Sequence, residues 1–177
     1  TVESIDLITR YPGKKVLGRR SIVVRSASTK SLAIKLLQPD IIQNVHDYSN
    51  GAADLVVETK LLTSMTPHPN IIKLHGISSA GIGGFFPQKG GYFLLLDRLS
   101  QTLDKRIESY RKTQPKRLIE NSFLERLEIA VDLSSAMSHI HKHRVVFRDL
   151  KPDNVGFDSQ GNVKIFDFGL AKELDPR

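Results

Sequence analysis

The spacing of apolar residues changes near Leu99, and this change limits the folds that the chain can adopt. Before that point the apolar residues form short runs rich in valine, isoleucine and leucine, over residues 21–24, 31–37, 71–75 and 92–96. Such runs predict strands. After Leu99 the spacing becomes helical, first over residues 104–112 and then in a long amphipathic segment. A β-rich first part followed by a helical second part predicts an α+β fold.

One helix is predicted within the β-rich part, over residues 53–65, after a turn at residues 50–51. Four of its residues share one face by their spacing: Leu55, Glu58, Leu62 and Met65. A carboxylate on an apolar face is costly to bury without a cation. Glu58 is therefore expected either to pair with a cation or to reach solvent at the rim of the face. The glycine-rich residues 79–91 are expected to form a flexible loop.

The second part predicts a long helix and a hairpin. A capping-box pattern from Ser122 to Glu125 predicts the start of the helix. Helical spacing gives this helix one apolar face, which we expect to be exposed in these residues alone. Its residues are Phe123, Leu127, Ala130, Val131, Ser134, Met137 and His141. Runs at residues 155–157 and 163–166 flank a turn and predict a hairpin. We expect two domains, residues 1–99 and 100–177, with a hinge near residues 97–100.

Composition excludes several classes of protein. The chain has 177 residues, of which 40% are hydrophobic and 25% charged, as in an ordinary globular protein. It has no cysteine, which excludes a disulfide framework, a thiolate metal site and a cysteine nucleophile. The formal net charge is +7, but the lysines and arginines are scattered, so we expect no nucleic-acid partner. No membrane span or signal peptide is evident, and an intracellular, cytoplasmic location is expected. The oligomeric state stays open.

The strongest chemical signal lies in two short segments near the end of the chain. Residues 147–154 contain Asp149, Lys151 and Asn154, and residues 167–169 open with Asp167 after the predicted hairpin. A single aspartate in a loop is usually a capping residue. The joint spacing instead resembles the protein kinases, in which an aspartate is followed five residues later by an asparagine, and a further aspartate opens an Asp-Phe-Gly triplet.

This resemblance implies a two-lobed, protein-kinase-like fold with a β-rich N-lobe, one main N-lobe helix and an incomplete helical C-lobe. It implies ATP and Mg²⁺ as cofactors and a protein as substrate. Asp149 would orient the substrate hydroxyl, Lys151 would steady the transferred phosphate, and Asn154 and Asp167 would ligate the metal. Magnesium prefers hard oxygen ligands of this kind. The Lys-Pro-Asp-Asn form of residues 151–154 resembles the Ser/Thr branch.

The first part contains further matches to the family. Residues 32–35 match the strand in which Lys35 grips the ATP phosphates, with Ala33 against the adenine. The family's ion pair makes Lys35 the expected partner of Glu58. At the predicted hinge, the backbone C=O of Asp97 and N–H of Leu99 would meet the adenine edge. Taken alone, the lysine could equally be an exposed strand residue.

The chain departs from the family at the glycine-rich loop. Gly18 occupies the first glycine position, Arg20 and Val23 stand at the other two, and Gly13 is a competing start. Gly18 and Val24 are our candidates for ATP contact in this segment. Glycines let backbone N–H groups approach phosphates, so their replacement affects the usual cradle.

Five positions outside that loop also need interpretation. Phe147 replaces the usual histidine, and Gly156 stands where a larger apolar residue commonly floors the adenine pocket. His139, His141 and His143 offer an alternative zinc site. Successive histidines in this group are two residues apart, and residues two apart on a helix do not share a face.

The sequence thus favours an ATP-dependent kinase that transfers the γ-phosphate to Ser/Thr hydroxyls of proteins. The alternative is a pseudokinase that binds nucleotide or serves as a scaffold, as the altered glycine-rich loop indicates. The resemblance covers most of this chain but only part of a family domain, so we expect these residues alone to be inactive.

Overall fold

The computed structural model describes residues 5–6, 19–25, 31–37, 45–85, 91–112 and 119–175. The chain divides into two compact units, and each is described separately. The first contains residues 1–64 and 73–98, and the second contains residues 65–72 and 99–177. The segment 65–72 therefore belongs with the second half of the chain, although it lies within the first half of the sequence.

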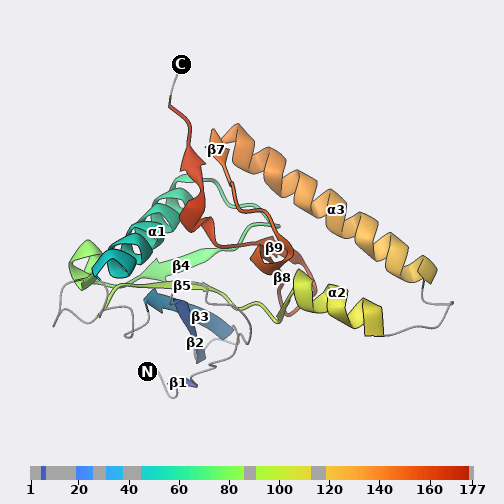
Figure 1. Cartoon of the computed structure of the whole chain (residues 1–177), viewed down its shortest axis with the longest axis horizontal. Helices are drawn as coiled ribbons and strands as arrows, with labels where there is room; N and C mark the ends of the chain where they lie inside the picture. Colours follow the sequence, from blue (N-terminus) through green and yellow to red (C-terminus); the bar gives the residue numbers. More distant parts are fainter. Residues whose placement is uncertain are drawn as a thin grey trace. The chain divides into compact units, whose positions relative to one another are not determined.

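The first unit is built on a five-stranded antiparallel sheet in the order β1-β2-β3-β5-β4 (Figure 1). The strands are β1 (Ile5–Asp6), β2 (Arg19–Arg25), β3 (Ser31–Leu37), β4 (Leu74–Ile77) and β5 (Phe93–Asp97). The expected strand at 31–37 has the predicted bounds, and those at 21–24 and 92–96 are confirmed within a few residues.

The strand expected at residues 71–75 is wrong over its first part. Ile71 makes an isolated parallel bridge with Ile165, and β4 begins only at Leu74. The Ile72 N–H donates to the Ile165 carbonyl oxygen at 2.9 Å, and the Ile165 N–H donates to Asn70 at 2.8 Å. The backbone at residues 70–72 is therefore paired within the second unit. The apolar pattern could not reveal this pairing, because residues 70–72 have the same strand-like spacing whether they pair with β4's sheet or with Ile165.

Helix α1 (Val45–Ser64) is longer than the predicted helix at residues 53–65. The expected turn at residues 50–51 lies inside it. A Cβ on residue 51 would stand 2.7 Å from the Leu37 Cδ2, so glycine allows α1 to approach β3 closely. The face that α1 buries contains Gly51, Leu55, Glu58 and Leu61. Leu62, which we expected on this face, is only half-buried, and Leu61 is buried instead.

Part of the predicted flexible loop is packed against the first unit. Residues 81–85 form the short 3₁₀ helix η2 (Gly81–Phe85), while residues 86–90 lie outside the described part. The Phe85 ring stacks on Tyr92, with 4.3 Å between the ring centroids. Tyr48 of α1 contacts Phe85 edge-on and donates its hydroxyl to the Phe85 carbonyl oxygen. These aromatic contacts hold the first half of the segment in place.

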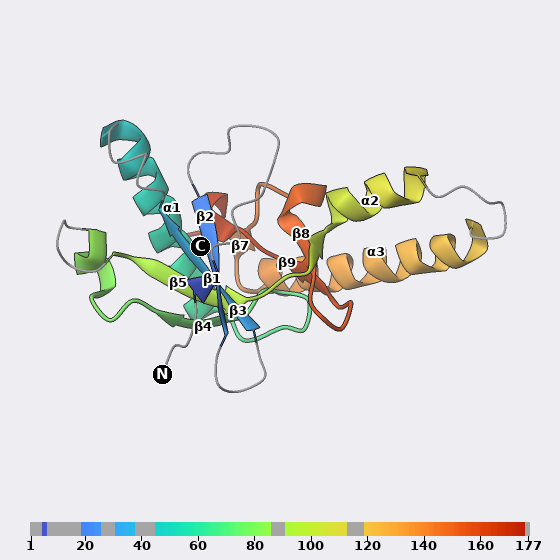
Figure 2. The same ribbon diagram turned by 90° about the horizontal axis from the view of Figure 1, so that it is seen from below.

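The second unit contains two helices and two small sheets. Its helices are α2 (Leu103–Lys112) and α3 (Ile119–Lys142), which lie side by side (Figure 2). One sheet has the order β6-β8-β9, and the other pairs β7 with β10. The strands are β6 (Gln101–Thr102), β7 (Val145–Val146), β8 (Val155–Phe157), β9 (Val163–Ile165) and β10 (Lys172–Glu173), with 3₁₀ turns η4 (Pro152–Asn154) and η5 (Phe168–Leu170).

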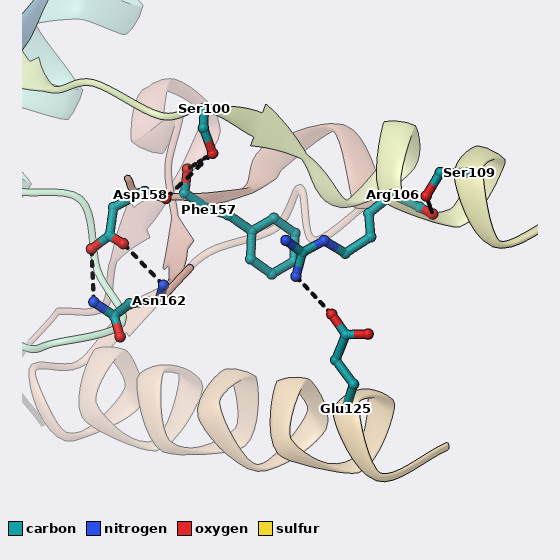
Figure 3. Close-up of polar contacts among 7 residues, drawn as sticks. All are labelled: Ser100, Arg106, Ser109, Glu125, Phe157, Asp158 and Asn162. Carbon is teal, nitrogen blue, oxygen red and sulfur yellow. Dashed lines mark hydrogen bonds and ion pairs between the residues drawn. The ribbon is translucent and has the colours of Figure 1, made fainter. Parts of the chain in front are cut away.

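The predicted hairpin is confirmed by the antiparallel pairing of β8 with β9. Asp158 organises its turn, because one carboxylate oxygen accepts the backbone N–H groups of Gln160 and Asn162, both at 2.9 Å. Burial raises the pKa of this carboxyl, but the hydrogen bonds from Asn162 and Gln160 outweigh burial and hold the pKa below its usual value. Figure 3 shows Asn162 facing Asp158 across the turn.

Helix α3 begins three residues before the predicted start, at Ile119 instead of Ser122. The expected capping box is wrong, since Ser122 and Glu125 both lie inside the helix. Glu125 instead accepts a hydrogen bond from Arg106 of α2 at 2.9 Å, and the Arg106 guanidinium lies 3.7 Å from the centroid of the Phe157 ring (Figure 3). One arginine thus joins α2, α3 and β8.

The apolar face described from the sequence is exposed, as expected for these residues alone, and other residues of α3 pack. The buried positions are Ile129, Ala136 and Ile140, and Ile129 packs in a core cluster with residues of β8 and β9. The predicted face is largely exposed, with Phe123 57% and Val131 68% accessible. Helix α3 carries two apolar stripes, and the hairpin selects one of them. In the described part of the chain, no helix is both long enough and apolar enough to cross a membrane.

A pair of alanine substitutions tests which stripe of α3 packs. Ile129→Ala is expected to lower the free energy of unfolding by about 2–5 kcal/mol, because it opens a cavity in the cluster. Val131→Ala, on the exposed stripe, is expected to change it by less than about 0.5 kcal/mol. Chemical denaturation of both variants measures the difference. Equal losses would contradict the observed packing.

Histidines attach the segment 65–72 to α3. The Asn70 N–H donates to His68 Nδ1 at 3.1 Å, and His68 Nε2 lies 3.2 Å from the Ser135 hydroxyl. The His68 ring packs on His139, with 4.8 Å between centroids. Because Nδ1 accepts a backbone N–H, His68 is held as the neutral imidazole. Burial is the main cause that lowers the pKa of His68 below 6.5, and the nearby His139 is the second. Asp132 acts to raise the pKa, and Lys164 acts to lower it.

His139 and His143 extend this contact to Thr66. The two ring centroids are 4.4 Å apart, with His139 in the last turn of α3 and His143 directly after the end of the helix. His139 Nε2 lies 2.8 Å from the Thr66 carbonyl oxygen, and the Thr66 N–H donates to His143 Nε2 at 3.3 Å. His141 is exposed. No group of three histidine, cysteine or acidic side chains suited to a metal occurs among the described residues.

The lowered pKa of His68 predicts loss of stability in mild acid. The unfolded chain takes up a proton at His68 as the pH falls through 6.5, while the folded chain resists it, so the free energy of unfolding falls below that pH. Unfolding measured between about pH 5 and pH 8 should show a weaker pH dependence in His68→Asn, whose amide oxygen can accept the same N–H. The exposed His141→Asn is the control. Parallel pH profiles for wild type and His68→Asn would refute the assignment.

Candidate functional site

The first unit contains a buried ion pair between Lys35 and Glu58. Lys35 lies on β3, the central strand of the sheet, and Glu58 lies on the buried face of α1. The Lys35 Nζ donates to a Glu58 carboxylate oxygen, and both residues are buried. The predicted pairing is confirmed, and the alternative that Glu58 reaches solvent is wrong, since its exposure is 0%. A buried carboxylate without this cation would cost several kcal/mol.

The register of the sheet locates the other strand residues proposed for nucleotide contact. Ala33 lies opposite Val23 of β2 and opposite Leu96 of β5. Val24 lies opposite Leu32, so Val23 is the β2 residue directly across from Ala33. Gly18 falls outside the described residues. The sequence does not show which β2 residue lies across from Ala33, because this requires the β2–β3 register, which alternation within one strand does not provide.

Asp97, at the end of β5, has its side chain bound within the first unit. One carboxylate oxygen accepts the Lys73 N–H at 3.0 Å, and the other lies 2.7 Å from the His75 Nε2. The Asp97 N–H also donates to the Lys73 carbonyl oxygen at 3.1 Å. These bonds fix the strand end through the side chain. The backbone carbonyl of Asp97 is the group that the sequence prediction assigns to a ligand.

In the second unit, Asp149, Lys151 and Asn154 lie together. The Lys151 Nζ donates to Asp149 Oδ2 at 2.7 Å. The Asn154 Nδ2 donates to the same carboxylate oxygen at 2.8 Å and to the Asp149 backbone carbonyl at 2.9 Å. The 3₁₀ turn η4 sets this spacing, because its first residue is proline and the Asn154 N–H bonds the Lys151 carbonyl oxygen at 2.9 Å. A cation and an amide thus hold Asp149 as an oriented carboxylate.

Asp167 is brought next to this group by the hairpin. The Phe166 N–H donates to the Asn154 backbone oxygen at 3.0 Å. Asp167 is the next residue after Phe166, so this bond keeps it near Asn154. Asp167 has φ 69° and ψ 70°, the left-handed region that side chains other than glycine rarely adopt. Such a conformation costs of order 1–3 kcal/mol and persists where the surroundings impose it.

Two buried aromatic rings connect residues 147–149 with η5. Phe147 and Phe168 are both buried and meet edge to face, with 4.9 Å between centroids. Arg148, between Phe147 and Asp149, also has a positive φ of 65°. Its Nε donates to the Leu170 carbonyl oxygen at 2.5 Å, which connects residues 147–149 to η5. The phenylalanine at position 147 is therefore a packing residue.

The oxygen atoms at this place fit a magnesium ion. The two Asn154 Nδ2 hydrogens point to Asp149, so the Oδ1 of this amide is directed away from that carboxylate. Asn154 and Asp167 can each offer a hard oxygen ligand. Magnesium in phosphate-transfer sites commonly takes one or two protein oxygens and completes its shell with phosphates and water. The donor set suits that arrangement.

Comparison with known proteins agrees with this geometry. The protein kinase domain family matches residues 13–177. The probable L-type lectin-domain containing receptor kinase V.3 of Arabidopsis thaliana is 32% identical over 154 residues, 85% of this chain and 20% of that protein. Protein kinase 2 of Dictyostelium discoideum is 27% identical over 167 residues, 92% of this chain and 30% of that protein.

Serine/threonine-protein kinase Sgk3 of Rattus norvegicus is 27% identical over 165 residues, 91% of this chain and 29% of that protein. The chain therefore spans less than a third of the length of these relatives. The α+β fold, with a β-sheet in the first unit and helices in the second, is that of a kinase domain. The match over residues 13–177 shows that the chain belongs to the protein kinase family, and its relatives include serine/threonine kinases.

Proposed function

We propose that this domain transfers the γ-phosphate of ATP to serine or threonine hydroxyls of protein substrates, with Mg²⁺ as cofactor. The observation that carries the proposal is the Asp149 carboxylate, held by Lys151 and Asn154 beside Asp167. Phosphoryl transfer needs little covalent chemistry from the protein and depends on positioning and charge stabilisation. These four residues provide both within one unit.

Each of these residues has a distinct role in the proposed reaction. Asp149 orients the attacking hydroxyl and accepts its proton as the new phosphorus–oxygen bond forms. The bond from the γ-phosphorus to ADP breaks, and Lys151 stabilises the negative charge on the transferred group. Asn154 Oδ1 and the Asp167 carboxylate hold Mg²⁺. When bound, the metal neutralises charge on the phosphates and aligns them.

The first unit supplies the proposed nucleotide contacts except that of Leu99, which is the first residue of the chain after it. The Lys35 ammonium binds the phosphates, and Glu58 fixes the direction in which that ammonium points. Ala33 contacts the adenine, and the register favours Val23 over the originally expected Val24 as its cross-strand neighbour. Gly18 would close the phosphate side. The Asp97 carbonyl and the Leu99 N–H would bind the adenine edge. The two expected domains, residues 1–99 and 100–177, correspond in this proposal to the two lobes of a kinase.

A pseudokinase is the second candidate, because Arg20 and Val23 stand at two glycine positions of the phosphate loop. A pseudokinase would bind nucleotide or a partner without transferring phosphate. The complete set of Asp149, Lys151, Asn154 and Asp167 supports the enzyme, since scaffolding alone gives no reason to orient a carboxylate in this way. An intracellular location, ATP and protein partners, and the absence of nucleic-acid binding are parts of the same proposal.

Substitution of Asp149 tests the catalytic role in the full-length protein. Asp149→Asn keeps the size of the side chain but removes the proton acceptor, so kcat for peptide phosphorylation should fall about 10²- to 10⁴-fold. ATP affinity should change little. Asp153→Asn removes an exposed carboxylate from the same turn and is the matched control. Wild-type protein that binds ATP but phosphorylates nothing would favour the pseudokinase.

A double-mutant cycle tests the Lys35–Glu58 pair. Lys35→Met and Glu58→Gln should each destabilise the fold by about 3–5 kcal/mol, because each removes a charge-assisted hydrogen bond between two buried residues. The double variant should lose less stability than the two single variants lose together, by a coupling energy of about 0.5–3 kcal/mol. Lys35→Met should also weaken ATP binding, whereas Lys73→Met, at an exposed lysine, should not. Additive losses in denaturation would argue against the pair.

A further inference from the structure

Gly156 occupies a buried position in the middle of a sheet, where a side chain is usually needed for packing. It lies on β8, the central strand of β6-β8-β9, opposite Thr102 of β6 and Lys164 of β9. Glycine in a strand interior weakens the strand and commonly marks a place where another group approaches closely. Something must therefore fill the space beside this residue.

The side chain of Leu99 fills that space. A Cβ on residue 156 would stand 2.6 Å from Leu99 Cδ1, 3.2 Å from the Gln101 carbonyl oxygen and 3.3 Å from Phe166 Cε1. The nearest of these atoms, at a separation no real pair adopts, is the tip of the leucine. Leu99 itself is only half-buried, so part of its surface remains exposed. The leucine thus covers Gly156 on one side and presents an apolar surface on the other.

The exposed part of Leu99 lies close in the chain's fold to Asn154, one of the two proposed metal ligands. Val155 and Phe157 belong to the core cluster with Ile129 and Val163. Successive residues of a strand alternate between faces, so Gly156 and the covering Leu99 lie on the opposite face. Asn154 directly precedes β8 and is two residues away, about 7 Å along an extended chain. A nucleotide whose phosphates meet the metal at Asn154 would extend past this surface.

We propose that Leu99 supplies the apolar surface on which the nucleotide base rests, in place of the side chain that Gly156 lacks. The inference rests on the function proposed above. A planar base needs an apolar surface beneath its ring, and leucine provides this from either position. Residues 99 and 156 then act as one pair, in which one large side chain serves both positions. The absence of a side chain at Gly156 does not reduce affinity for the base, because the Leu99 side chain fills the space that a larger residue at position 156 would occupy.

Exchange of the leucine between the two positions tests the proposal. In the full-length protein, Leu99→Ala should weaken the binding of ATP and of adenosine by the same factor, about 10-fold, since only the base contact is lost. Gly156→Leu should also weaken binding, because the new side chain displaces Leu99. The double variant Leu99→Ala/Gly156→Leu should recover most of the wild-type affinity. Calorimetric titration measures all four dissociation constants.

Gly156→Ala gives a second route if Gly156→Leu does not fold. It should weaken ATP binding more when Leu99 is present than in the Leu99→Ala background, where the closest contact of the new Cβ, with Leu99 Cδ1, is removed. Leu103→Ala is the matched control, because Leu103 packs against the core cluster on the other face. It should lower stability without changing nucleotide affinity.

The outcomes separate this inference from the proposed function. Lys35→Met should weaken ATP binding but leave adenosine binding unchanged, which identifies a working phosphate contact. If wild type binds ATP but Leu99→Ala changes nothing, or if the two substitutions are additive, the leucine proposal is wrong and the kinase proposal stands. Wild type that binds neither ATP nor adenosine overturns both.

Discussion

Glu58 is a carboxylate on the buried face of a helix, and the first unit depends on neutralising it. A charge in this place is tolerated only with a cation and good geometry. Lys35 satisfies that condition from the central strand of the sheet, while Gly51 allows α1 to approach β3. The ion pair therefore joins the helix to the sheet, and it fixes the direction of an ammonium group whose four-carbon side chain is otherwise flexible.

In the second unit, the Asp149 carboxylate is also held by a lysine, but together with an amide. Asp149 must be held in one orientation, although it lies in a loop between short elements. Asn154 and Lys151 bind the same oxygen of that carboxylate, and the 3₁₀ turn keeps the three residues in register. Phe147 and Phe168 pack beneath the two loops. Rigid apolar contacts thus support polar groups whose hydrogen bonds fix their directions, a common arrangement in preorganised sites.

Prediction from sequence succeeded where a pattern was local and failed where two solutions were equally good. The strand at residues 31–37 and the hairpin at residues 155–165 were recognisable because periodicity and turn residues agree there. The residues of α3 that pack on the hairpin were not, because Ile129 lies outside the apolar face that the spacing reveals, and that face is exposed. The start of α3 was misplaced for a related reason, since Glu125 binds Arg106 instead of capping its own helix.

The sequence by itself indicated the family and the residue types of the proposed site through the spacing of its motifs. The cost of burying charge showed that Glu58 needs a cation, and the family resemblance named Lys35 as that cation. Tertiary structure alone decided the β2–β3 register, the attachment of residues 65–72 to α3 through histidines, and the position of Leu99 against Gly156. Each of these joins groups far apart along the chain or on separate elements. Local periodicity carries no information about which surfaces meet, because that choice depends on the shape and volume of the folded partner.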